Sequence, residues 1–260
     1  MTDGRTPSLF RAALRHGTAL GTWVKIAAPE SMELVALAGF DFAVIDMEHS
    51  TIDLETAYVL IGIARSAGVS PIVRVSAVAA GTIGRLLDAG AEGIMVPHVD
   101  TVEQATAAAY AVRFPPIGGR GVGSTSRAGA WGAMSRADYL RYGQEEVVLI
   151  AQIESAAAAR NAGAIAAVPG VDALLIGAAD LSTSEGTTES DPAVVELIAG
   201  AIRDTTAAGV PIGNAGAATA ASVQAAVDAG YSFTLMSNDA SMLGAAAQAA
   251  VTAGRSIHYA

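Results

Sequence analysis

The chain has 260 residues, of which 52% are hydrophobic and 15% are charged, and its formal net charge at pH 7 is −10. This composition can fill a large core and excludes an intrinsically disordered chain, while the acidic balance argues against a nucleic-acid-binding surface. The chain contains no cysteine, which excludes disulfides, thiolate metal sites and a cysteine nucleophile.

The first 20 residues contain Arg5, Arg11, Arg15 and His16 and lack the apolar core of a signal peptide. No apolar stretch farther along is long and charge-free enough to suggest a membrane span. We therefore expect a cytoplasmic protein that has neither a membrane nor a nucleic-acid partner.

Short apolar runs typical of strands recur along the chain, and Ala- and Leu-rich segments of helical length follow them. The runs are 21–26, 40–48, 71–75, 93–98, 147–154, 172–180, 211–216 and 231–237. Helices are predicted from about Pro29 to Gly39, over 53–67 and over 103–112, and Gly39 and Gly68 are natural helix stops. A last Ala-rich helix closes the chain.

Several of these runs lack a strict alternation of apolar and polar residues, as expected of strands that are buried on both faces. Alternating strands and helices imply a parallel sheet, and eight such units in about 250 residues match the size of a (β/α)8 TIM barrel. We predict one barrel domain over 1–260. The longest irregular stretch, from 114 to about 135, is rich in glycine and is long enough to be functional or to mediate assembly.

Catalytic groups of such barrels lie where the strands end at their carboxyl side. Glu154 and Asp180 occupy such ends, and carboxylates there are costly without a cation. Two hard oxygen ligands favour Mg²⁺ or Mn²⁺, with water and substrate completing the coordination. The alternative is that they are helix caps or loop carboxylates.

Two further strand ends carry candidate catalytic side chains. His49 lies close to Asp46, and a carboxylate beside an imidazole orients it and raises its basicity, so His49 is a candidate general base; it could also be an ordinary loop histidine. Arg74 needs an anionic partner, which could be a substrate carboxylate or enolate, or Glu48 or Asp46. His98 is a second histidine candidate.

Six motifs, taken in order and with their spacing, resemble the HpcH/HpaI family of class II, metal-dependent pyruvate aldolases. They are FAVIDMEH (42–49), VRV (73–75), LLDAGAEG (86–93), FPPIGGRG (114–121), QIE (152–154) and IGAADL (176–181). The resemblance extends from about 21 to 243 and implies a barrel of the phosphoenolpyruvate/pyruvate type.

The resemblance also implies roles for single residues. His49 would be the base, Asp88 would raise its basicity, and Arg74 would stabilise the enolate. Glu154 and Asp180 would bind Mg²⁺, Mn²⁺ or Co²⁺. Gln152 and the backbone around Ala179 and Asp180 would contact the pyruvyl group. Family members are typically hexamers, so a homo-oligomer built as a trimer of dimers is expected, with the segment 117–132 reaching a neighbouring site.

The chain departs from the family pattern at Ala178, Glu185, Asn214–Gly216 and Lys25, all near the barrel mouth. These departures bear on the acceptor aldehyde more than on the reaction. The reaction that the resemblance implies is reversible cleavage of a 4-hydroxy-2-oxo acid to pyruvate, or a close 2-oxo acid such as hydroxypyruvate, and an aldehyde. One rival is a Schiff-base aldolase using Lys25, the only lysine. Others are a carbon–carbon lyase acting on a CoA-linked or other 2-oxo acid and a non-catalytic barrel.

Overall fold

A computed structural model describes residues 8–257 as a closed barrel of eight parallel strands, in which each strand pairs with its neighbours in sequence and β8 pairs with β1. The strands are β1 (Ala19–Val24), β2 (Phe42–Asp46), β3 (Ser70–Arg74), β4 (Gly93–Val96), β5 (Val148–Ile153), β6 (Ala173–Ile176), β7 (Ile212–Gly216) and β8 (Phe233–Asn238). The predicted (β/α)8 barrel is confirmed, and each predicted run overlaps one strand.

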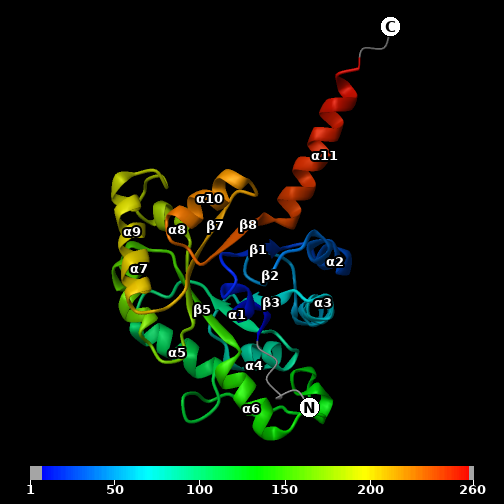
Figure 1. Cartoon of the computed structure of the whole chain (residues 1–260), viewed down its shortest axis with the longest axis vertical. Helices are drawn as coiled ribbons and strands as arrows, with labels where there is room; N and C mark the ends of the chain where they lie inside the picture. The colour runs from blue at the N-terminus through cyan, green and yellow to red at the C-terminus, as the bar shows by residue number, and fades with distance from the viewer. Residues whose placement is uncertain (1–7, 258–260) are drawn as a thin grey trace.

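Helices surround the barrel (Figure 1). They are α1 (Leu9–Leu14), α2 (Pro29–Ala38), α3 (Leu54–Ala67), α4 (Ala80–Asp88), α5 (Val102–Val112), α6 (Arg136–Glu145), α7 (Ala156–Ala166), α8 (Ala178–Ser184), α9 (Pro192–Ala207), α10 (Ala220–Asp228) and α11 (Asp239–Arg255). The irregular stretch before α6 holds one 3-10 turn, η1 (Arg127–Gly132). No helix within 8–257 has the length and apolarity needed to cross a membrane.

The predicted helix ends follow from local chemistry. Asp53 caps α3 by accepting a hydrogen bond from the Thr56 N–H, and Pro29 opens α2. Gly39 and Gly68 close the two helices with φ of 89° and 81°, a left-handed conformation that glycine adopts without a steric cost. Both predicted stops are confirmed.

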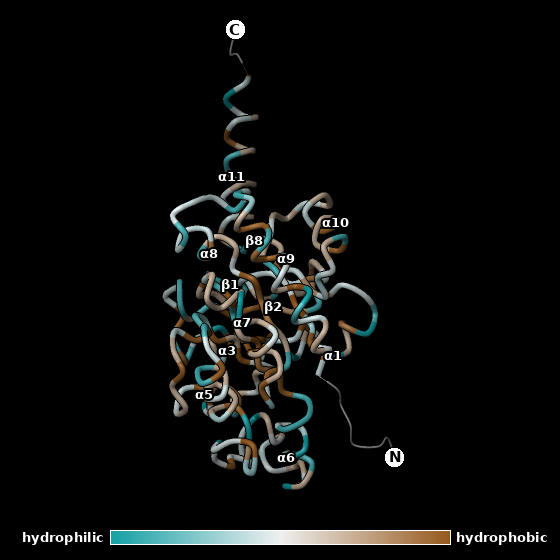
Figure 2. Tube along the Cα trace, turned by 90° about the vertical axis from the view of Figure 1, so that its left-hand side faces the viewer, coloured by the Kyte–Doolittle hydropathy of each residue, from teal (hydrophilic) through white to brown (hydrophobic). Residues whose placement is uncertain are grey.

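Alternate residues of each strand face two separate apolar layers. On β2, Phe42 and Val44 belong to the cluster inside the barrel, whereas Ala43 and Ile45 pack outward against the helices. Figure 2 shows the hydrophobic stretches gathered in the middle of the body, around β2 and β8. Both layers are closely packed, so the barrel is a scaffold that fixes whatever its strand ends carry.

The amino end of the barrel is closed. Phe10 of α1 is fully buried and meets the rings of Phe42 and Phe233 edge-on, with centroid distances of 5.0 and 5.3 Å. These rings come from the first residues of β2 and β8, so α1 plugs that end. Only the opposite end, where the strands finish, is left to receive a substrate.

The predicted run over 172–180 extends farthest beyond its strand. The run 172–180 was expected to be extended as far as Asp180, but β6 ends at Ile176 and Asp180 lies in the first turn of α8. The apolar letters continue through Ala178 and Ala179, which favour a helix as readily as a buried strand.

The last helix, α11, leaves the body and extends away from it (Figure 1). Of its 17 residues only Asp239 is buried. Its charged residues, Asp239 and Arg255, lie at its two ends, and the Ala-rich length between them is mostly exposed. A helix of this kind gains most of its stability from packing, which the described chain does not supply along most of its length.

Candidate active site

The inner face of the barrel turns from apolar to polar at the carboxyl ends of the strands. Asp46, Arg74 and Gln152 are the outermost inward-facing residues of β2, β3 and β5, and they follow Val44, Ile72 and Ile150 of the inner cluster. All three polar side chains are buried. The alternation that fills the barrel with aliphatic groups therefore also aims these groups at its mouth.

Arg74 is held on several sides. Its Nε and Nη2 donate to the two oxygens of Asp46 at 2.9 and 2.7 Å, and its Nη1 lies 3.1 Å from Glu48 Oε2. The guanidinium also stacks on the Trp23 ring, 4.2 Å from the centroid. A two-pronged ion pair with stacking is the geometry in which an arginine is most rigid.

Asp46 is completely buried and anchors two cations, because Lys25 Nζ donates to its Oδ2 at 2.6 Å. Burial by itself raises the pKa of Asp46, but the hydrogen bonds from Arg74 and Lys25 outweigh it and hold that pKa well below its usual value. Asp46 is therefore an ionised structural anchor.

Glu154 follows the end of β5 and is 5% exposed. Its carboxylate accepts hydrogen bonds from Gln152 Nε2 and from the backbone N–H of His98, both at 2.9 Å. Burial raises the pKa of Glu154, hydrogen bonding and charge from His98 lower it, and the carboxylates of Asp180 and Glu48 raise it further. These acids mark a place where a cation would be stabilised.

Asp180 lies in the first turn of α8, with Ala179 beside it, and both are exposed. Gly177 connects β6 to this helix, and a Cβ built there would lie 2.8 Å from Glu154 Cγ. A side chain at this position would displace the Glu154 carboxylate. The glycine thus permits the close approach of the two elements that carry the two acids.

His49 and His98 are both exposed at the mouth and both face Glu48. His49 Nε2 lies 3.7 Å from Glu48 Oε2, and His98 Nε2 lies 3.4 Å from Glu48 Oε1. His98 Nδ1 is also 3.0 Å from Glu154 Oε2. His98 has a φ of 54°, the left-handed conformation that turns its N–H toward Glu154.

The expected contact between Asp46 and the imidazole of His49 is corrected by this geometry. Asp46 Oδ1 accepts the backbone N–H groups of Glu48 and His49, both at 3.1 Å, and the side-chain donors to Asp46 are Arg74 and Lys25. The carboxylate nearest the His49 ring is Glu48. Asp46 and His49 are in contact, as their spacing predicted, but the carboxylate of Asp46 accepts the backbone N–H of His49 and does not contact its ring.

Asp88 is not brought to His49 within one chain. It ends α4, and in a parallel barrel the end of a helix returns to the closed, amino side of the strands. There it accepts hydrogen bonds from Arg120 Nη2 at 2.8 Å and from the Tyr139 hydroxyl at 2.9 Å.

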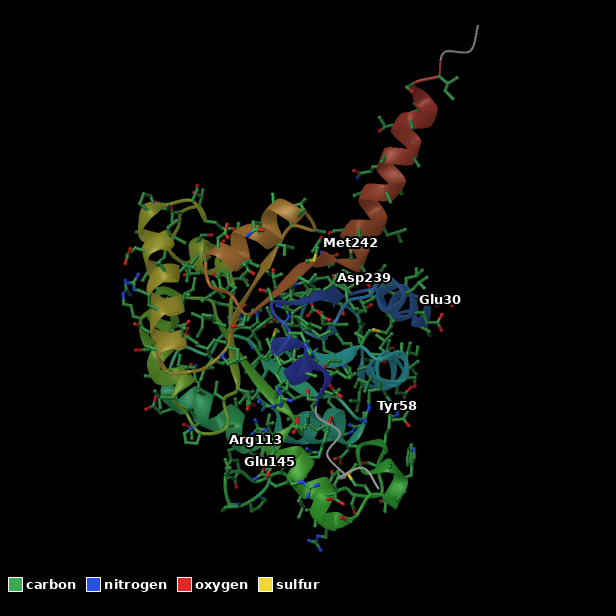
Figure 3. All side chains as sticks on the ribbon, in the orientation of Figure 1. Glu30, Tyr58, Arg113, Glu145, Asp239 and Met242 are labelled. Atoms are coloured by element: carbon green, nitrogen blue, oxygen red, sulfur yellow. The ribbon has the colours of Figure 1, made fainter. Side chains whose placement is uncertain are left out.

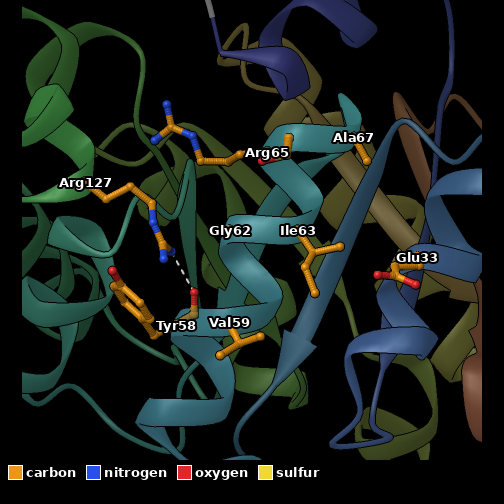
Figure 4. Close-up of a pocket in the computed structure, with 9 residues that line it drawn as sticks. Glu33, Tyr58, Val59, Gly62, Ile63, Arg65, Ala67 and Arg127 are labelled. Atoms are coloured by element: carbon orange, nitrogen blue, oxygen red, sulfur yellow. Dashed lines mark hydrogen bonds between the residues drawn. The ribbon is translucent and has the colours of Figure 1, made fainter.

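Two adjoining cavities lie on the outer flank of the barrel. One, of about 900 Å³, is lined by α3 and by Arg127, whose Nη1 donates to the Tyr58 carbonyl (Figure 4). The other, of about 510 Å³, is lined by Asp88, Arg127 and Trp131. Apart from Asp88, no predicted site residue lines either cavity, so both are separate from the mouth.

The polar mouth suits an oxygen-liganded cation in part. Within 8–257 no three His, Cys, Asp or Glu side chains are arranged to hold a metal ion. Glu154 nevertheless has acidic neighbours, and Gln152 Oε1 is a buried acceptor without a partner. Two carboxylates and an unused amide oxygen form a hard donor set that fits Mg²⁺, Mn²⁺ or Co²⁺ with other ligands supplied from outside.

One contributor was missed by sequence reasoning, Trp23 of β1, whose ring supports Arg74. Because side chains alternate along a strand, the positions of β1 that face the barrel interior could be predicted, and Trp23 is one of them. Glu48 was predicted as a possible partner of Arg74; it contacts Arg74 and also faces both histidines. Lys25 was noticed for its rarity, yet its bond to Asp46 depends on strand register.

Comparison with known proteins gives a consistent result. Residues 19–256 match the family model described as HpcH/HpaI aldolase/citrate lyase. The chain is 38% identical to a 2-dehydro-3,6-dideoxy-6-sulfogluconate aldolase of Pseudomonas putida, over 88% of this chain and 89% of that protein. It is 41% identical to a 4-hydroxy-2-oxovalerate aldolase of Novosphingobium aromaticivorans, over 78% of each.

A solved structure has the same architecture. The crystal structure of an HpcH/HpaI aldolase/citrate lyase family protein from Burkholderia cenocepacia superposes with a TM-score of 0.88 at 34% identity, covering 95% of this chain and 99% of that one.

Proposed function

The chain belongs to the HpcH/HpaI aldolase/citrate lyase family, and on that basis we propose that it is a lyase that reversibly cleaves a 4-hydroxy-2-oxo acid. The products are pyruvate, or a close 2-oxo acid such as hydroxypyruvate, and an aldehyde. The observation that carries the proposal is the rigid Arg74, aimed into a mouth that also holds acids and two histidines.

Cleavage begins at the C4 hydroxyl. His49 accepts its proton, the C4 carbonyl forms, and the electron pair of the C3–C4 bond becomes the C2–C3 double bond of an enolate. Arg74 stabilises the negative charge on the enolate oxygen, as a fixed donor does when it needs no reorganisation. Return of a proton to C3 gives pyruvate, and the aldehyde leaves. Synthesis is the reverse.

Gln152 and the first turn of α8 are proposed to bind the pyruvyl group. The backbone N–H groups of Ala179 and Asp180 belong to a helix start, where donors lack partners inside the helix. The amide nitrogen of Gln152 donates to Glu154, whose side chain lies against Gly177, the residue before this helix. These donors would orient the carboxylate and oxo groups of the acid.

Glu154 and Asp180 would hold a divalent cation, Mg²⁺, Mn²⁺ or Co²⁺. When bound, such an ion supplies Lewis-acid stabilisation of charge in the enolate. The chain's own part is to keep both carboxylates at the mouth, through Gly177 on one side and the His98 N–H on the other.

We further propose a homo-oligomer, a hexamer arranged as a trimer of dimers. The support is α11, which extends from the body with Leu243 62% exposed, and the cavity of about 410 Å³ at its root. That cavity is almost entirely apolar, and Leu34, Met242 and Leu243 line it. Figure 3 shows Asp239 and Met242 at this root, on the side of Glu30 in α2.

The test is a cleavage assay on purified protein with Mn²⁺. A panel of 4-hydroxy-2-oxo acids that differ beyond C4, including 4-hydroxy-2-oxovalerate, is offered, and pyruvate release is followed. We expect release from at least one of them, and at least a hundredfold loss in His49→Ala and Arg74→Met, in keeping with about 10²-fold or more for a general base. Release of no 2-oxo acid from any member would contradict the proposal.

A further inference from the structure

Lys25 is the only lysine of the chain and lies directly after β1, at the barrel mouth. It is two residues after Trp23, so by the alternation of side chains along a strand it falls on the inward-facing side. Its side chain is 26% exposed, and its Nζ is bonded to the buried Asp46 at 2.6 Å. The mechanism described above gives this residue no part.

The backbone at Lys25 is fixed from outside the barrel. The N–H groups of Lys25 and Ile26 donate to the carboxylate of Asp239 at 2.9 and 3.0 Å. Ser31 Oγ donates to the same carboxylate at 2.5 Å. Asp239 is buried at the start of α11, so the strand end and the ammonium it carries are held in one place.

Lys25 balances the charges of the cluster formed by Arg74 and its carboxylate partners. Arg74 contacts two carboxylates, Asp46 and Glu48, and so without Lys25 this cluster would hold one positive and two negative charges. With Lys25 it holds two of each. In a buried site that must accept the carboxylate of a 2-oxo acid, an uncompensated negative charge would oppose binding strongly.

We propose that Lys25 is a positioning residue that neutralises Asp46, so that the positive charge of Arg74 is not cancelled by its carboxylate partners and acts on the 2-oxo acid and its enolate. This inference rests on the proposed aldolase function. It assigns Lys25 to the pyruvyl half of the substrate, through Arg74, and gives it no covalent step. An ammonium engaged with a buried carboxylate at 2.6 Å is a charged donor and lacks the free electron pair of a nucleophile.

The experiment separates charge from covalent chemistry. Exchange of the methyl protons of pyruvate in D2O, followed by NMR with Mn²⁺ present, reports enolate formation without an acceptor aldehyde. Lys25→Met removes the charge, and Lys25→Arg keeps it. Arg203→Met is the matched control, because it removes one positive charge from an exposed pair with Glu196 on α9.

We expect Lys25→Met to raise the KM for pyruvate and to lower kcat/KM at least about tenfold, the scale of losing one partner of a buried charge pair. Lys25→Arg should remain within about threefold of the parent because its charge is retained. Arg203→Met should behave as the parent. Circular dichroism checks the fold, which Asp46 paired with Arg74 should maintain.

A chemical arm uses the folded parent protein. Its amines are Lys25 and the α-amino group, so reductive methylation, which keeps the charge, should leave exchange intact, whereas carbamylation, which removes it, should reduce exchange. The same treatments of Lys25→Arg report the contribution of the α-amino group.

Parent-like KM and kcat in Lys25→Met would overturn the inference. Equal losses in Lys25→Arg and Lys25→Met would overturn it as well, and a borohydride-trapped pyruvate adduct on Lys25 would identify a nucleophile instead. Absence of exchange and of cleavage in the parent protein would be a failure of the proposed function itself.

Discussion

At the scale of single residues, the site is organised by Asp46. A fully buried carboxylate is costly unless it is paired, and here two neighbouring strands supply the partners, Arg74 from β3 and Lys25 from the end of β1. The two catalytic candidates that touch substrate in the proposal, Arg74 and His49, both depend on it. Arg74 donates to Asp46 through its side chain, and His49 donates to it through its backbone N–H.

Replacement of this anchor is predicted to cost stability. Asp46→Asn leaves Arg74 and Lys25 without their common anion and should lower the free energy of unfolding by about 3–5 kcal/mol. Urea denaturation at pH 7 measures it. Asp204→Asn, at an exposed position of α9, is the control and should stay within about 0.5 kcal/mol.

The same pair predicts a pH dependence. Because the pKa of Asp46 is lowered in the folded state, its contribution is fully present above the ordinary value of 3.8 and is lost as the pH falls below it. The difference in free energy of unfolding between the parent protein and Asp46→Asn should therefore be constant from pH 7 to about pH 5 and shrink below pH 3.8. A difference that grows on acidification would contradict the assignment.

The sequence identified several of these residues but not their contacts. Asp46, Arg74, Glu154 and Gln152 could be predicted because strand ends in a barrel converge. Which oxygen meets which nitrogen depends on the register between β2 and β3, where Asp46 lies opposite Arg74, and no local pattern records it.

At the scale of elements, the connection from β6 to α8 sets the distance between the two acids. Gly177 lies between them with no room for a side chain, because a Cβ would lie 3.1 Å from Glu154 Oε1. The sequence did not predict this turn because the apolar residues continue through Ala179, past the end of β6. By contrast, the ends of α2 and α3 were predictable because Gly39, Gly68 and Asp53 act within a few residues.

Gly177→Ala is predicted to weaken Mn²⁺ binding by about tenfold while leaving the barrel folded, since displaced supporting contacts cost metal affinity on that scale. Isothermal titration measures the affinity. Gly84→Ala in α4 is the matched control, because a Cβ there meets nothing within 4 Å. It should leave Mn²⁺ affinity unchanged and raise stability by about 0.5–1 kcal/mol. Parent-like affinity in Gly177→Ala would refute the proposed role of this turn.

At the scale of the whole molecule, the barrel buries its own core, whereas we propose that α11 and Asp88 serve contacts with other copies of the chain. α11 buries only its first residue, and Asp88 lines a cavity on the outer flank instead of the mouth. Neither feature could be interpreted from hydrophobic periodicity, which predicts that a helix has an apolar side but not which molecule covers it.

Leu243→Glu is predicted to break the assembly, because it places a charge in the apolar cavity at the root of α11. Light scattering coupled to size-exclusion chromatography should show about six subunits for the parent and fewer for the variant. Val195→Glu, which alters an exposed aliphatic residue of α9, should keep the parent mass. A monomeric parent protein would remove the basis of the oligomer proposal.

The central claim is that Glu154 and Asp180, at the barrel mouth, hold a cation that supports an enolate. The most direct measurement is proton exchange of pyruvate in D2O by protein stripped with EDTA and then supplied with Mn²⁺. The account predicts that exchange disappears on stripping, returns with Mn²⁺, and falls at least about a hundredfold in Glu154→Gln and Asp180→Asn. Exchange that survives stripping, or full metal-dependent exchange in both variants, would contradict it.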